Sequence, residues 1–353
     1  MTFEDLAAKY HWIEYNPETG EVDVFLDHHA MQSYRACESY FDLNILQNQQ
    51  LKGGHSWSLS FGIVFHSVME YIYKNKLVNF EGTFNVVEEA HKLWLQHNMH
   101  ERFSEHKSYK ALGGFEGFMG IIAQYSHYYN QDIERLRPIA IEVPFGKAKE
   151  VYLGQFIIQK PDRELERFFT SCIVEQKIVN CYLTGRIDFL MDSGTTIGPM
   201  DHKTTAFFGG KNPMNTYEIQ EGMTGYIFAT NQIIKSMFPE LAAKRSTNTM
   251  WINFIQIQNE VDPQKRFKRL PLMKTPWQLE QYRLRQVSTI RNIIDMLIEE
   301  RTPTWSTDRC ANFYHSECVY KAVHRQGSES SMFSILESDY KQEKVWDPEN
   351  MED

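Results

Sequence analysis

Two short segments carry residue types that could hold a metal ion and act on a phosphate. The first contains Gly185 and Asp188 in a Thr-Gly-Arg-Ile-Asp run, and the second is Asp201-His202-Lys203. Two carboxylates can bind a hard divalent cation through oxygen. Because side chains alternate along a strand, a lysine two residues after an aspartate lies on the same face. Such an ammonium beside a metal could steady an attacking water or the charge that develops on a phosphate oxygen.

A β-hairpin over residues 182–205 is expected to position these groups. The chain around Asp188 is rich in strand formers, an Asp-Ser-Gly-Thr turn signal follows at 192–195, and the Asp201 segment has the pattern of the return strand. A tight turn there would place Asp188 opposite Pro199, one or two rungs from Asp201. A bulge could bring the two carboxylates level. The alternative is a solvated hairpin with surface charges.

The overall composition is that of an ordinary globular protein. The chain has 353 residues, of which 42% are hydrophobic and 24% charged, enough for one large or two modest cores. The sequence shows no long apolar run, no cationic and apolar leader, and five widely spaced cysteines. These features argue against a membrane span, a signal peptide and a secreted disulfide framework. We therefore expect a cytoplasmic protein with no membrane partner.

One short basic segment stands out against the net charge of −9. A local groove can be positive on an acidic protein, so nucleic acid is not excluded as a partner. The segment runs from Lys265 to Arg269, with Lys274 close behind. It is interpreted equally well as a DNA-contacting patch or as a solvated hairpin arm.

The hydrophobic pattern predicts a mixed α/β (α+β) body with a helical N-terminal part. The expected helices are 28–50, 58–73, 84–133, 217–236 and 276–300, and the expected strands are 139–145, 182–191, 197–205, 250–258 and 267–272, with a less regular stretch after the first strand.

Four motifs, taken in chain order, resemble those of the PD-(D/E)XK nuclease superfamily. Within it they are most similar to the RecB/AddB-like exonuclease branch, which includes CRISPR-adaptation nucleases and phage exonucleases. The resemblance covers residues from about 28 to 325 and implies a restriction-endonuclease-like core, with a central mixed sheet flanked by helices. The motifs are the helix segment 62–70, Gly185–Asp188, Asp201–Lys203 and the helix segment 220–226.

The resemblance implies a metal-dependent catalytic site built from these motifs. Asp188 and Asp201 would bind magnesium or manganese through their carboxylates, and His202 would bind it through its backbone carbonyl. Lys203 would position the attacking water or offset transition-state charge. His66 would be a further metal ligand, whereas a histidine on an apolar helix is in general more often a core residue.

The helix after the hairpin would complete the catalytic set with Gln220 and Tyr226. The family usually spaces this glutamine and tyrosine four residues apart, whereas here Gly222 lies four before Tyr226 and Gln220 lies six before it. A local adjustment could still bring Gln220 to the site, and Tyr226 could equally be a core residue.

A second constellation resembles the iron–sulfur cluster site that fastens the C-terminus of some members of this branch. Cys37, Cys310 and Cys318 match the first three positions, and His324 stands at the last position of the Cys-x5-Cys pattern. Three thiolates and an imidazole can hold a [4Fe–4S] cluster or a tetrahedral zinc ion. The resemblance favours the cluster, and the ligand types by themselves favour zinc. His315 is a competing fourth ligand, and the cysteines could also be ordinary buried thiols.

These observations predict four segments along the chain. The segments are a helical part at 1–135 with the histidine motif and the first cluster cysteine, the nuclease core at 136–275, a C-terminal helix and cysteine/histidine segment at 276–325, and an acidic, mobile tail at 326–353.

The predicted function is that of a divalent-metal-dependent deoxyribonuclease. The resemblance implies an exonuclease acting on single-stranded or duplex DNA ends in recombination, repair or phage DNA processing, with a helicase or recombinase as a candidate partner protein. The sequence shows no P-loop, so an ATP-driven motor would be another chain. The alternative is a catalytically silent or partner-dependent DNA-binding subunit of a DNA-processing complex.

Overall fold

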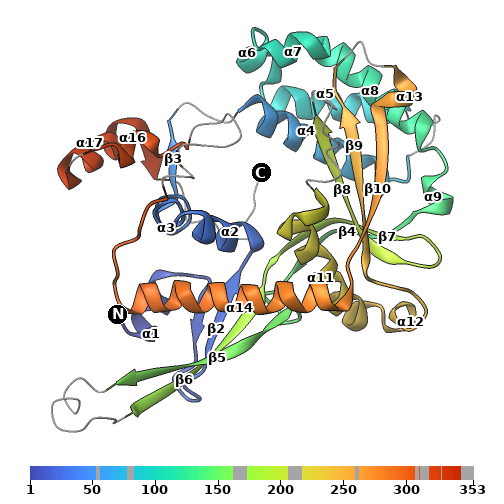
Figure 1. Ribbon diagram of the computed structural model, residues 1–353. Helices are drawn as coiled ribbons and strands as arrows, with labels where there is room; N and C mark the ends of the chain where they lie inside the picture. The colour runs from blue at the N-terminus through green and yellow to red at the C-terminus, as the bar shows by residue number, and fades with distance from the viewer. Residues whose placement is uncertain are drawn as a thin grey trace. The chain divides into compact units, whose positions relative to one another are not determined.

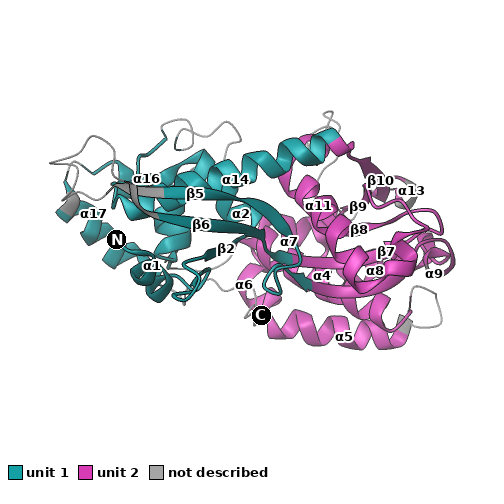
Figure 2. Cartoon of the chain, turned by 90° about the horizontal axis from the view of Figure 1, so that it is seen from below, with its two compact units in different colours: residues 1–54, 144–185, 277–353 teal, residues 55–143, 186–276 magenta. Residues whose placement is uncertain are grey.

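The chain folds into two compact units, each assembled from segments far apart in the sequence (Figure 2). The two units interleave along the chain and do not follow the sequential division expected at residues 135 and 275. Unit 1 comprises residues 1–54, 144–185 and 277–353, and unit 2 comprises residues 55–143 and 186–276. The computed structural model describes residues 1–52, 56–77, 83–161, 173–205, 217–258, 262–306, 310, 318–326 and 328–342.

Unit 2 is built on a five-stranded mixed sheet of order β10-β9-β8-β7-β4 (Figure 1). β7 runs antiparallel to β8, β8 runs parallel to β9, and β9 runs antiparallel to β10. Gly198 allows β8 to approach β9 closely, because a Cβ there would lie 1.9 Å from the carbonyl oxygen of Thr249. The strands are β4 (Arg137–Phe145), β7 (Gly185–Asp192), β8 (Ile197–Thr205), β9 (Thr249–Gln256) and β10 (Phe267–Met273).

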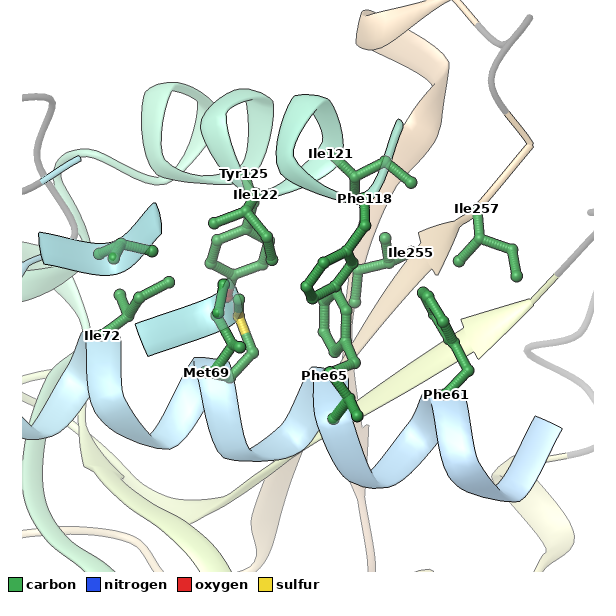
Figure 3. Close-up of a cluster of buried hydrophobic side chains, with 14 of the residues drawn as sticks. Phe61, Phe65, Met69, Ile72, Phe118, Ile121, Ile122, Tyr125, Ile255 and Ile257 are labelled. Carbon is green, nitrogen blue, oxygen red and sulfur yellow. The ribbon is translucent and has the colours of Figure 1, made fainter. Parts of the chain in front are cut away.

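Helix α4 (Trp57–Lys74) confirms the helix expected at 58–73 and packs its apolar stripe into the core of unit 2. Its N-terminus is capped by Ser56, whose Oγ accepts from the amide of Leu59 at 3.3 Å. The stripe contacts side chains of helix α8 and of the sheet (Figure 3). The helical region expected at 84–133 is divided into five helices. They are α5 (Thr83–Gln96), α6 (Met99–Phe103), α7 (Lys107–Leu112), α8 (Gly114–Tyr128) and α9 (Asp132–Arg135).

Helix α11 (Glu221–Met237) packs against β8 and β9 and corresponds to the helix expected at 217–236. Residues 217–219 form a separate helical turn before it. Two short helices complete the described part of unit 2, α12 (Pro239–Ala242) and α13 (Pro263–Arg266).

Part of the basic segment Lys265–Arg269 is buried in unit 2, whereas Lys265 and Lys268 are exposed. Arg266 is 1% exposed and donates to the carbonyl of Gln256 at 2.7 Å. The Arg269 side chain is 18% exposed and pairs with a carboxylate inside the unit. Lys274 is also buried. For these three cations, neither a DNA-contacting patch nor a solvated arm is correct, because their side chains contribute to the interior of unit 2.

Unit 1 contains a four-stranded sheet of order β1-β2-β6-β5, in which β2 and β6 are parallel and the other pairs antiparallel. The described part of the stretch expected to be irregular after the first strand is thus mostly strand. The strand expected at 182–191 is divided at Thr184 between β6 and β7. Frequent polar residues in β5 and β6 obscure their alternation. The strands are β1 (Ile13–Tyr15), β2 (Val22–Leu26), β5 (Tyr152–Pro161) and β6 (Ile173–Leu183).

The helix expected at 28–50 is interrupted, because Cys37 adopts an extended backbone. Its last part pairs as β3 with β11, a strand in the segment expected to be a mobile tail. The described elements here are α1 (Phe3–Lys9), α2 (His28–Ala36), α3 (Glu38–Phe41), a π-helix (Asp42–Leu46), β3 (Gln49–Leu51), α14 (Pro276–Ile298), α16 (Lys321–His324), α17 (Glu329–Asp339) and β11 (Tyr340–Gln342).

No described helix combines the length and the apolar character that a membrane crossing requires.

A buried carboxylate anchors the turn between β7 and β8. Asp192, at the end of β7, accepts from the amide of Gly194 at 2.7 Å, from Arg245 Nε at 3.1 Å and from Arg137 Nη2 at 3.2 Å. Burial would raise the pKa of Asp192, but these donors outweigh it and hold that pKa below its usual value. The ionised carboxylate therefore stabilises the hairpin.

We predict that Asp192→Asn lowers the free energy of unfolding by about 3 kcal/mol near neutral pH, because it leaves two arginines facing a neutral group. The folded-state pKa is lowered, so this contribution is complete above the unfolded pKa of about 3.9 and is lost as pH falls through the folded value. Urea unfolding of the wild type and variant between pH 7 and pH 3 should show the difference shrinking. Arg137→Gln is the control, with a loss below about 1 kcal/mol, because this partner is 62% exposed. A difference that is independent of pH would contradict the ionic account.

Candidate functional site

The register of the β7–β8 hairpin brings Asp188 level with Asp201. The described pairing runs from Asp192–Ile197 to Phe189–Met200, so the next rung is Asp188–Asp201. The expected pairing of Asp188 with Pro199 is wrong by two residues, because four residues, 193–196, connect the strands. No bulge is needed to align the two carboxylates.

His66 joins these carboxylates from helix α4. Ligand atoms of His66, Asp188 and Asp201 all lie within 4.8 Å of one another. His66 Nδ1 lies 3.0 Å from Asp188 Oδ2, and His66 Nε2 lies 2.7 Å from the backbone oxygen of His202. Because both ring nitrogens face oxygen acceptors, the ring is held as a doubly protonated donor. Three of the sequence-predicted ligands and the predicted backbone carbonyl therefore converge on one place.

Lys203 lies beside the same cluster. Its Nζ lies 2.7 Å from Asp201 Oδ2, and its side chain is 34% exposed. Asp201 Oδ2 itself is buried and makes no well-aligned hydrogen bond with the described residues. The ammonium thus pairs with one carboxylate while keeping access to solvent.

The electrostatic consequences differ between the two carboxylates. Burial raises the pKa of Asp201, since Lys203 compensates it only in part and Asp188 repels it. Burial also opposes ionisation of Asp188, but the His66 hydrogen bond outweighs it and lowers the pKa of Asp188. Burial would lower the pKa of His66 and of Lys203, yet the neighbouring carboxylates raise both. Two anions and two cations therefore nearly balance in this site.

The donor set fits a hard divalent cation. Two carboxylates, a backbone carbonyl and an imidazole suit magnesium or manganese, and the nitrogen donor suits manganese in particular. The ligand atoms of His66, Asp188 and Asp201 lie within 4.8 Å of one another, close enough to share one ion. The residues present are therefore compatible with the predicted metal, and their roles as ligands remain a prediction.

The remaining predicted catalytic residues lie on α11. Gln220 is the N-cap residue of this helix, and Tyr226 is half-buried within it. Their catalytic roles also remain predictions. Tyr217, on the turn before α11, interacts electrostatically with Lys203 and Asp201, and no sequence motif singles it out.

A second ion pair, between Glu142 and Arg186, lies near this cluster. Glu142 in β4 has a positive φ of 51° and lies 2.6 Å from Arg186 Nε. Burial raises its pKa to about 7, and it interacts electrostatically with Asp188 and Glu70. The positive φ of this non-glycine strand residue marks a local irregularity of β4.

A pocket of about 600 Å³ in unit 2 is lined in part by Tyr129, Trp251 and Arg269. None of His66, Asp188, Asp201 and Lys203 lines it. The convergence of ligand atoms therefore identifies the candidate site better than this hollow does.

Unit 1 contains a second group of ligand atoms. Those of Cys310, Cys318 and His324 lie within 4.8 Å of one another, and Cys310 Sγ lies 3.2 Å from His324 Nδ1. A tetrahedral zinc ion with Zn–S bonds of about 2.3 Å separates its ligands by roughly 3.8 Å, so two thiols and an imidazole fit such a centre. His315, the competing ligand, lies outside the described residues.

Cys37 is near this group without being part of it. Its Sγ accepts from the amide of Ser306 at 3.3 Å, but it does not lie within 4.8 Å of all three ligand atoms. A cluster holds its protein ligands further apart than a single ion does. Cys37 therefore remains a predicted ligand of an iron–sulfur cluster. In this arrangement it is too far from the other ligand atoms to bind a single zinc ion with them.

The chain matches the PD-(D/E)XK nuclease superfamily over residues 28–323 and therefore belongs to that superfamily. Membership indicates a metal-dependent nuclease that hydrolyses phosphodiester bonds and has DNA as its substrate. No curated protein gives a significant match to the chain.

We predict that purified protein carries iron or zinc bound by the Cys310, Cys318 and His324 group. Cys318→Ser should remove most of this metal and lower the thermal midpoint by several degrees, because an ion that binds only the folded arrangement of Cys310, Cys318 and His324 stabilises it. Elemental analysis and thermal unfolding measure both effects, and a brown colour distinguishes a cluster from zinc. Cys181→Ser, at a buried thiol outside the group, is the control and should keep the metal. Protein with neither metal would show that these thiols are ordinary core residues.

Proposed function

We propose that this protein is a divalent-metal-dependent DNA exonuclease of the RecB/AddB-like branch. The observation that carries the proposal is the convergence of His66, Asp188 and Asp201 beside the Asp201–Lys203 ion pair. The branch and the exonuclease mode rest on the similarity of the four sequence motifs. A cytoplasmic location is part of the proposal and is supported by the free thiols of the four described cysteines.

The site residues divide the work between binding the ion and handling charge. Asp188, Asp201, His66 and the carbonyl of His202 would hold magnesium or manganese, which supplies an activated water and charge stabilisation at the scissile phosphate when bound. His66 must release a proton to offer a ring nitrogen, so loading of the ion is coupled to proton release. The charged Lys203 ammonium, exposed enough to reach substrate, stabilises the charge that develops on the phosphate.

The alternative is a DNA-binding subunit that is silent alone or depends on a partner such as a helicase. The paired Asp201 and Lys203 favour the enzyme, because a silent subunit has no need to keep a buried carboxylate beside a partly exposed lysine. An activity assay on the isolated chain separates the two.

We predict that Lys203→Met reduces cleavage of end-labelled DNA at least about 100-fold, since it removes a charge that acts in the transition state. Cleavage should be followed on single-stranded, blunt duplex and circular DNA with manganese, and an exonuclease should spare the circular forms. Lys235→Met, at an exposed position of α11, is the matched control and should keep full activity. Near wild-type cleavage by Lys203→Met would sink the assignment.

The identity of the ion gives a second test. Activity should appear with magnesium or manganese and fall to background with calcium, whose larger and looser coordination does not organise attack. Rates should be measured at equal ion concentrations after treatment with EDTA. Equal rates with calcium would require a different mechanism.

A further inference from the structure

One rung of the unit 2 sheet is polar within an otherwise apolar face. His202 of β8 pairs in register with Asn253 of β9, and Asn253 pairs with Arg269 of β10. The His202 and Asn253 side chains are fully buried, and all three point into the face that packs against α4 and α8. A polar row in such a place is costly unless every group is hydrogen-bonded.

Side chains from the helices supply most of the hydrogen-bond partners of this row, although the buried His202 Nδ1 has none among the described residues. Arg269 donates two bonds to Asp132, at 2.7 and 2.6 Å, and one to Asn253 Oδ1 at 2.6 Å. Tyr73 donates to Asp132 at 2.7 Å, and its oxygen lies 2.7 Å from that of Tyr125.

Arg269 can only donate, so Asn253 turns its oxygen toward Arg269 and its NH₂ toward Tyr125, at 3.0 Å. The same NH₂ lies 3.2 Å from His202 Nε2, and the Tyr125 hydroxyl lies 2.8 Å from that atom. Tyr125 and Asn253 therefore both contact one ring nitrogen and hold the His202 ring in one orientation.

The same residue belongs to the candidate metal site through its backbone. The carbonyl of His202 faces His66, and its chain neighbours are Asp201 and Lys203. The described pairing of β8 with β7 ends at Met200, so this stretch has no described ladder partner on the β7 side. The ladder to β9 continues past His202, and the anchored side chain adds a second hold on this residue.

We propose that Tyr125 and Asn253 are positioning residues for the metal site, which hold the His202 ring and through it the backbone carbonyl that would bind the ion. This inference rests on the proposed function, because it assigns that carbonyl to a metal. Neither residue contacts the ion or the substrate in this proposal. Residues that orient the ligands of a metal typically raise its affinity by roughly 10- to 100-fold.

The test is manganese binding to the full chain without DNA, measured by calorimetry with MnCl₂ as the probe. Tyr125→Phe removes the hydroxyl that bonds the buried His202 Nε2, and should weaken manganese binding by about 10-fold or more. Half-maximal cleavage should require a correspondingly higher manganese concentration, with the rate recovering at saturation. A purely structural role would lower the thermal midpoint and leave the affinity of the folded protein unchanged.

Tyr129→Phe is the matched control. It removes another buried tyrosine hydroxyl from the same helical region, but this hydroxyl has no hydrogen-bond partner among the described residues. Its manganese affinity should stay within about 2-fold of the wild type. If Tyr125→Phe does not fold, Asn253→Leu, which removes the donor to Tyr125 at similar volume, should weaken binding in the same direction.

The outcomes separate the two proposals. Wild-type affinity in folded Tyr125→Phe or Asn253→Leu overturns the positioning role and leaves the nuclease proposal intact. Weakened binding in both and wild-type binding in Tyr129→Phe supports it, even if the wild type cleaves no DNA, which would overturn only the nuclease proposal. A wild-type protein that binds no manganese overturns both.

Discussion

Two carboxylates that share a buried space impose the central constraint on unit 2. Asp188 and Asp201 repel each other and both lose hydration, so neither would stay ionised without compensation. His66 neutralises one and Lys203 the other, which gives a site close to electrical balance. A divalent ion would change this balance by displacing the His66 proton. The charges of the cluster thus balance before an ion binds. With the ion bound, the cluster would carry a net positive charge, which favours binding of a negatively charged substrate with or after the ion.

The architecture around this cluster can be understood as a means of holding β8 in place. The four-residue turn sets the register, and the Asp192 carboxylate keeps that turn closed. Gly198 lets β8 lie against β9 near its start. The His202–Asn253–Arg269 rung then fixes the strand from its apolar face. These devices act at the turn before β8, at its start against β9 and on its apolar face.

Helices and strands with a strong hydrophobic periodicity could be predicted from the sequence. The prediction failed where polar side chains lie in the interior. Helix α4 and strands β9 and β10 follow clear apolar patterns. The register was missed because a turn signal does not reveal loop length, and two residues decide which carboxylates meet. The basic run was misinterpreted because Arg266 and Arg269 are buried and bonded to distant groups. Asn253, a polar residue inside an apolar strand, was the one visible signal of the rung.

The C-terminal segment of unit 1 is docked before any metal is considered. Glu38 accepts two bonds from Arg301 at 2.8 Å and two more from Thr304, and the hydrogen bonds from Arg301 lower the pKa of Glu38 to about 2. Ser39 also bonds His324 Nε2 at 2.8 Å. These contacts already close a loop of more than 260 residues. A metal held by Cys310, Cys318 and His324 would add to an interface that is already assembled, and it would not itself close that loop, because its ligands all lie within residues 310–324. Its larger effect is to hold Cys310 and Cys318, whose own contacts are mostly apolar, in a single arrangement.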